Sequence, residues 1–184
     1  MFLKIGKNNN CEFLRQALHD IEEAKRKLNH EVGTLLAPDG SVIKEYGGNA
    51  HNINIPNDDV RLFEGNIFTH NHPGGGNFTV QDIKSFADNG LKEVRVSTPQ
   101  GTYYSLQTGE GEINRSIANV MKEEKVESSS NAMNILQKQI DEQNLVLTGH
   151  EYQKRLFGII DEEVDRWLSE NAAEFGYEYK KGMI

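Results

Sequence analysis

The sequence predicts an α/β fold in which a mixed sheet is flanked by helices and followed by a helical C-terminal extension. Apolar residues recur at three- and four-residue steps over residues 11–28, which is typical of an amphipathic helix. Two pairs of β-forming runs are each joined by a turn signal, Pro38-Asp39-Gly40 and Pro99-Gln100-Gly101. The chain then becomes charged and poor in aromatic residues. We therefore expect an α/β domain over residues 1–111, including the first helix, and a helical extension over residues 112–184 that packs on it.

The first part of the predicted sheet follows the N-terminal helix. Residues 31–37 and 41–46 are predicted to pair as a β-hairpin, after which residues 47–50 form a flexible link. Residues 51–55 alternate polar with apolar side chains, which predicts a short half-buried strand. Residues 57–60 have the pattern of a helix cap followed by a brief helical turn.

The second part of the chain supplies the core of the sheet. A strand is predicted from Ile67 to His72, followed by a helix over residues 79–89. Residues 91–98 and 102–106 are predicted to form a second hairpin. This order of elements gives a mixed α/β domain.

The extension is predicted to be mainly helical. Residues 112–147 are charged, with a break expected at Ser128–Ser130. Residues 150–173 form a helix whose apolar stripe we expect to pack against the sheet or the first helix. The tail, residues 175–181, is expected to form a short strand and then a frayed end.

A candidate metal site lies between the central strand and the helix that follows it. His70 and His72 are separated by one residue, so both imidazoles project from the same face of a strand. Pro73 and three glycines end the strand and turn the chain back. Thr79 is a good N-cap, which places Asp82 in the first helical turn, near the histidines. Two histidines and one carboxylate with an open fourth position form a ligand set of catalytic zinc, whose bound water has a pKa of about 7.

Several of these residues also have simpler interpretations. Thr79-x-x-Asp82 is a capping-box-like pattern, which needs no metal. Glu31, at the start of a predicted strand, is by itself typical of an exposed carboxylate. His51 is most simply a surface histidine on an edge strand, although it could also approach the site. The full combination of motifs is more specific than a His-x-His pair alone.

The segment His70-x-His72-Pro73-x5-Thr79-x-x-Asp82 resembles the signature of the JAB/MPN metalloproteases, or JAMM proteins, which include the RadC-like proteins of bacteria. The family pattern also has a glutamate on an upstream strand, and Glu31 occupies that place. The similarity extends from Glu31 to Leu106. Thr79 stands where the family usually has serine, and the loop before it is one residue shorter than the commonest spacing.

This resemblance implies a JAB/MPN-like fold with cytidine-deaminase-like layering, and one Zn²⁺ per chain held by His70, His72 and Asp82. It also implies that Glu31 acts as the general base and that Thr79 donates its hydroxyl to the developing oxyanion. The implied activity is that of a peptidase or isopeptidase acting on a peptide or protein substrate, with ubiquitin-like proteins among the candidates. The main alternative is a non-catalytic scaffold or interaction module of the same fold. A RadC-like link to DNA metabolism or mobile elements is a third interpretation.

Charge and composition restrict the partners further. The formal net charge of −8 argues against binding of nucleic acid phosphates. The single cysteine, Cys11, excludes an internal disulfide and fits a reducing compartment. No apolar run approaches the length of a membrane span, and the N-terminus lacks the hydrophobic core of a signal peptide. We therefore expect a soluble, cytoplasmic protein with no membrane partner, whose oligomeric state the sequence does not specify.

Overall fold

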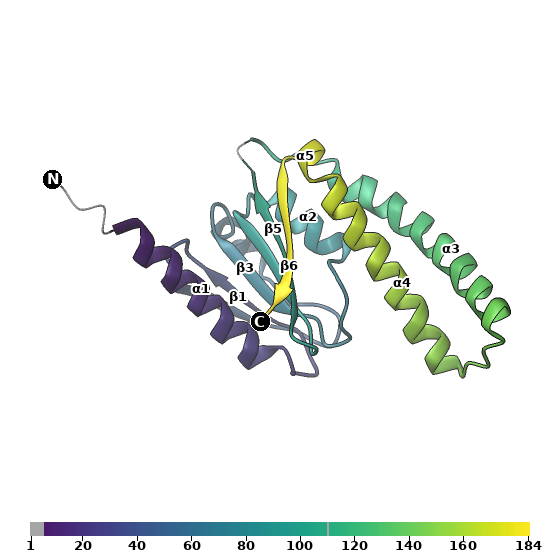
Figure 1. The fold of residues 1–184 in the computed structure, drawn as a ribbon. Helices are drawn as coiled ribbons and strands as arrows, with labels where there is room; N and C mark the ends of the chain where they lie inside the picture. The colour runs from purple at the N-terminus through teal and green to yellow at the C-terminus, as the bar shows by residue number, and fades with distance from the viewer. Residues whose placement is uncertain (1–5, 110) are drawn as a thin grey trace.

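A six-stranded mixed sheet forms the centre of the protein in the computed structural model, which describes residues 6–109 and 111–184 (Figure 1). The strand order is β2-β1-β3-β4-β5-β6, and every neighbouring pair is antiparallel except β3 and β4. The strands are β1 Val32–Leu36, β2 Val42–Gly47, β3 Ile67–Asn71, β4 Glu93–Ser97, β5 Thr102–Thr108 and β6 Tyr177–Met183. The helices are α1 Gly6–Lys25, α2 Val80–Asp88, α3 Ile117–Gln143, α4 Gly149–Glu170 and α5 Ala172–Phe175, and η1 Asn57–Leu62 is a 3₁₀ helix. The predicted α/β class with C-terminal helices is confirmed.

Helices cover both faces of the sheet. On one face, α1 packs through Leu18 onto Leu36 and Ile67 of the strands. On the other face, α2, α3 and α4 enclose the larger core; its members from the sheet and helices include Phe68, Val94, Leu106, Ile83, Phe86, Ile117, Met121, Val164 and Leu168. Figure 1 shows α1 and the α3–α4 pair on opposite sides of the strands. Successive residues of β3 therefore face different layers.

Both predicted hairpins are confirmed, and so is the helix between them. β1 pairs with β2, and β4 pairs with β5. Helix α2 begins after Thr79 and ends before Asn89, where the sequence placed its caps. Because α2 connects the parallel strands β3 and β4, the end of β3 lies beside the start of this helix.

The region between β2 and η1 differs from the expected one. The predicted strand over residues 51–55 is wrong, because the described chain makes only an isolated bridge there, between Gly48 and Ile53. The side-chain oxygen of Asn49 accepts hydrogen bonds from the backbone N–H groups of His51 and Asn52, which form a turn in place of a ladder. A Cβ atom on Gly48 would come 2.0 Å from the backbone oxygen of Asn52, so only glycine fits this turn.

Three predicted element ends or breaks also change. α1 begins at Gly6 and ends at Lys25, earlier at both ends than the predicted helix. The break expected at Ser128–Ser130 is wrong, because α3 continues through these residues. Ser129 and Ser130 donate hydrogen bonds to carbonyls four residues earlier, which satisfies their hydroxyls inside a helix.

The C-terminal segment returns to the sheet after its helices. β6 pairs with β5 along seven residues, from Thr108 opposite Tyr177 to Thr102 opposite Met183. The expected short tail strand is therefore the edge strand of the main sheet. The frayed end expected after it is wrong, because β6 runs to Met183 and the backbone N–H of Ile184 donates to the carbonyl of Gly101. The extension is helical, as expected, but it also supplies part of the sheet that it covers.

A buried ionic cluster fastens α1 to the strand that leads to the candidate site. Arg95 of β4 donates hydrogen bonds to Glu22 of α1 and to Glu93. The hydroxyl of Thr69, which lies next to His70 on β3, donates to Glu22 at 2.9 Å. Glu22 and Glu93 are 2% and 3% exposed, so Arg95 compensates two carboxylates that water does not reach. The face of β3 away from the candidate site is thereby held in place.

Candidate metal centre

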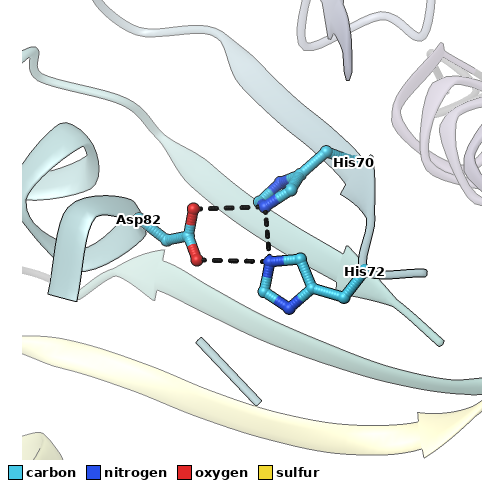
Figure 2. A group of neighbouring side chains, drawn as sticks. All are labelled: His70, His72 and Asp82. Carbon is cyan, nitrogen blue, oxygen red and sulfur yellow. Dashed lines mark hydrogen bonds and ion pairs between the residues drawn. The ribbon is translucent and has the colours of Figure 1, made fainter. Parts of the chain in front are cut away.

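Three side chains converge where β3 ends and α2 begins (Figure 2). His70 is the fourth residue of β3, His72 follows the strand directly, and Asp82 lies in the first turn of α2. The Nε2 atoms of the two rings are 3.1 Å apart. Asp82 presents Oδ1 to the ring of His70 at 3.1 Å and Oδ2 to the ring of His72 at 3.4 Å. The sequence-predicted ligands are thus brought together.

The spacing of these donor atoms fits a tetrahedral metal ion. Three donors bound to one zinc ion at about 2.0–2.1 Å lie about 3.3 Å from one another. The two Nε2 atoms, and Nε2 of His70 and Oδ1 of Asp82, are each 3.1 Å apart, which is close to that value. His72 faces the other oxygen, Oδ2, at 3.4 Å, and one donor atom from each residue lies within 4.8 Å of the other two. Both histidines are buried, at 3% and 6% exposure, so water does not surround the rings. Two imidazole nitrogens that face each other beside a carboxylate form an N/O donor set that can hold a divalent transition-metal ion.

Asp82 belongs to a capping box as well as to the ligand set. Its Oδ2 atom accepts hydrogen bonds from the backbone N–H and the hydroxyl of Thr79, each at 2.7 Å. The hydroxyl of Thr79 in turn accepts the backbone N–H of Asp82 at 3.2 Å. The helix-cap interpretation is therefore confirmed, and it does not exclude a metal, because Oδ1 remains directed at His70. Although burial alone would raise the pKa of Asp82, the two histidines hold it well below its usual range.

The two histidine rings are held in different ways. Burial alone would lower the pKa of His72, but Asp82 outweighs it and the pKa is raised. The backbone of Gly76, in the glycine loop, is among the groups that raise the pKa of His72. The ring of His70 stacks on Phe68, with centroids 5.5 Å apart. Its Nδ1 atom is buried and has no hydrogen-bond partner among the described residues.

Glu31 lies at the same site as the three ligands. In the ladder between β1 and β3, Gly33 pairs with His70, so the side chain two residues earlier projects from the same face as the ligands. Glu31 is 9% exposed and lines the same cleft as His70 and His72. Burial raises the pKa of Glu31, against the charges of His72 and His70, which lower it. Glu31 is therefore no exposed strand-end carboxylate, the commoner situation for this residue type.

Asn71 fixes the backbone on both sides of Glu31, a role that sequence analysis missed. Its side-chain oxygen accepts the backbone N–H of Val32 at 2.7 Å, and its side-chain nitrogen donates to the carbonyl of His30 at 2.9 Å. The backbone N–H of Glu31 donates to the carbonyl of Asn49 at 2.7 Å. Asn71 is fully buried, so its amide is committed to these partners. The residue between the two histidines thus positions the carboxylate opposite them.

His51 lies at the rim of the same cleft. It is exposed, as expected, but it stands on the turn organised by Asn49 and on no strand. It lines the cleft together with Glu31, and its charge is among those that lower the pKa of Glu31. His51 therefore approaches the site, which was the less favoured of its two interpretations.

The C-terminal segment braces the glycine loop between His72 and Asp82. The backbone N–H of Asn77 donates to Asp161 of α4 at 3.2 Å, and its side chain donates to the hydroxyl of Tyr179 in β6 at 2.8 Å. Lys125 of α3 donates to the carbonyl of Phe78 at 2.7 Å. Three elements of the extension thus hold the loop that positions Asp82.

The function has to be inferred from these residues, because comparison of the chain with known proteins gave no match. A scan against family models and searches of curated proteins and solved structures found no match to this chain. Within the described residues, every helix is too short or too polar to cross a membrane.

The first prediction concerns how much the ionised carboxylate of Glu31 destabilises the folded protein. Because its pKa is raised by burial from an ordinary 4.5, the folded chain holds this proton more tightly than the unfolded chain. The stability due to Glu31 is therefore present below about pH 4.5 and lost as the pH rises through the folded pKa. With chelator present, Glu31→Gln should melt at a higher temperature than the native protein at pH 7.5, and the difference should close toward pH 4. A difference that stays constant with pH would contradict this account.

The second prediction concerns the brace. Asp161→Ala removes the acceptor for the Asn77 N–H, so the loop before Asp82 should loosen while all three ligands remain. Zinc affinity should fall by about tenfold at most, the lower end of the loss when a group bonded directly to a ligand is removed, because Asp161 acts on Asp82 only through the loop. Competition with a fluorescent zinc chelator measures the affinity. Glu162→Ala, at an exposed position on the same helix, is the matched control. Equal zinc affinity in the two variants would show that the brace does not act on the site.

Proposed function

We propose that the protein is a zinc-dependent hydrolase of amide bonds, a peptidase or isopeptidase with a JAB/MPN-like fold and cytidine-deaminase-like layering. The observation that supports this most is a buried carboxylate, Glu31, that shares one cleft with His70, His72 and Asp82. A ligand set with three protein donors leaves a coordination position free, which is typical of catalytic rather than structural zinc. A second carboxylate beside it is the group that such a reaction needs as a base.

The metal ion and Glu31 would have different roles in hydrolysis. Zinc at this site would supply Lewis acidity toward a carbonyl and lower the pKa of water to about 7. Glu31 is placed to accept a proton from a water molecule in the cleft and to return it to the leaving amine. Its raised pKa suits both steps. It makes the carboxylate a stronger base toward the water molecule, and it lets the protonated side chain hold the proton until the amine leaves.

The hydrogen bonds of Thr79 indicate that it orients Asp82. Its hydroxyl donates to Oδ2 of Asp82, which orients that carboxylate toward the histidines. The oxyanion role that the family resemblance implies requires this hydroxyl to turn away from Asp82. We therefore propose that Thr79 is first a positioning residue for Asp82, and that any donation to an oxyanion accompanies substrate binding.

The lining of the cleft favours a peptide over a nucleic acid. Among the described residues that line it, none is lysine or arginine, while Glu31 and Asp82 are both acidic. A phosphodiester would meet these carboxylates with no lysine or arginine to offset them, so its attraction to the cleft would depend on the metal ion and the histidines. The net charge of −8 points the same way. The proposed substrate is therefore an amide in a peptide or protein, ubiquitin-like proteins included, and the RadC-like link to DNA gains no support from the site.

The rival proposal is a non-catalytic scaffold of the same fold. A scaffold has no need of Glu31, because burying a carboxylate beside a ligand set costs stability and adds no packing. The two hydrogen bonds of Asn71 on either side of this residue indicate that its position matters. These contacts favour the enzyme.

The test separates chemistry from metal binding. Glu31→Gln should retain zinc and lose hydrolysis by about 10²–10⁴-fold, the usual contribution of a positioned base. Zinc content is measured by elemental analysis, and hydrolysis by mass spectrometry of a peptide library and of isopeptide-linked substrates. Glu64→Gln, at an exposed position outside the cleft, should behave as the native chain. A fully active Glu31→Gln would remove this residue from the mechanism, and a zinc-loaded native chain that cleaves nothing would favour the scaffold.

A further inference from the structure

The cleft at the candidate metal centre has a second, apolar half. The volume of the whole cleft is about 430 Å³, within the range of pockets that bind small ligands. The polar half holds Glu31 and the three ligands. The apolar lining of the cleft consists of the partly buried side chains of Ile53, Ile55 and Val60 above a floor of core side chains, Phe63, Phe68 and Val94, which are 0%, 4% and 1% exposed.

The apolar half begins directly beside a ligand. Phe68 lies two residues before His70 on β3, on the same face of the strand, and the two rings stack with centroids 5.5 Å apart. Gly33 makes room for this arrangement: a Cβ atom there would come 2.3 Å from the ring of Phe68 and 3.2 Å from Cδ1 of Ile53. Phe68 and Ile53 therefore meet over the backbone of β1, one ring away from the ligand set.

The walls of the apolar half differ from each other. On one side, Ile53 and Ile55 stand on the segment between β2 and η1, and both are only partly buried. On the other side stand Gln81 and Ser85 of α2 and Asn89, the residue that caps its C-terminus. They recur at four-residue steps, so they lie along one side of the helix. The side chain of Asn89 donates to the hydroxyl of Ser85 at 3.1 Å. An apolar floor beside a row of hydrogen-bonding groups suits an extended peptide, whose backbone is polar and whose side chain is not.

We propose that this half of the cleft is a specificity pocket for an apolar side chain, of the size of leucine, isoleucine or phenylalanine, next to the amide that is cleaved. The cleavage part of this statement rests on the proposed function, whereas binding of the side chain does not. Continuity with the ligand set places the neighbouring amide at His70, His72 and Glu31. The described lining contains no lysine or arginine, so it offers an anionic side chain or a phosphate neither of these cationic partners.

The experiment measures side-chain recognition without requiring hydrolysis. The full-length protein as purified, with methyl-labelled isoleucine and valine, is titrated with N-acetyl-leucine N-methylamide and with N-acetyl-serine N-methylamide. Both probes carry the same backbone amides, so they differ only in the side chain. The leucine probe should bind about tenfold more tightly, because burying most of an isobutyl group contributes that much. It should shift the methyl signals of Ile53, Ile55 and Val60.

Variants from both walls locate the pocket. Ser85→Phe should fill it from α2 and abolish the advantage of the leucine probe, whereas Lys84→Phe, exposed on the same helix, should keep it. Ile53→Ser removes apolar surface from the other wall and should reduce the advantage even if Ser85→Phe fails to fold. Equal binding of the two probes, or shifts confined to methyls outside the cleft, would overturn the proposal.

The outcome is independent of the proposed hydrolase activity. A chain that prefers the leucine probe but hydrolyses no amide would keep the pocket and remove the enzyme. A chain that hydrolyses amides with no preference between leucine and serine would keep the enzyme and remove the pocket.

Discussion

One carboxylate, that of Asp82, has a role both in the fold and in the candidate site. Asp82 closes the capping box that starts α2, and the same side chain faces His70 and His72 at the end of β3. The start of the helix and the ligand set thus depend on the same side chain. The position of α2 relative to β3 therefore determines the geometry of the site. The histidines hold the pKa of Asp82 well below its usual range, so this carboxylate is ionised near neutral pH and available to a cation.

Support for this arrangement comes from both faces of the sheet. On the α1 side, Glu22 receives hydrogen bonds from Arg95 and from Thr69, the residue next to His70. On the other side, Asp161 and Tyr179 hold Asn77 in the loop between the ligands. The C-terminal segment is therefore part of the framework of the site. Rigid support of this kind keeps ligands near productive geometry without the ion.

Sequence analysis predicted what local patterns determine and missed what distant contacts determine. The caps of α2 and the same-face pair His70 and His72 follow from short-range rules, and the structure brings these residues together with Asp82. The strand expected at residues 51–55 failed because Asn49 satisfies the backbone locally, which alternation of side chains does not reveal. The contact between Asn77 and Asp161 joins residues 84 positions apart, and no local pattern predicts it.

The central claim is that His70, His72 and Asp82 hold a metal ion. The most direct test is elemental analysis of protein purified without chelator, compared with the double variant His70→Ala, His72→Ala. We expect about one zinc per native chain, as three convergent donors would give, and none in the double variant, with the fold of both checked by circular dichroism. Equal zinc in the two proteins, or none in the native chain after zinc is supplied, would contradict the account.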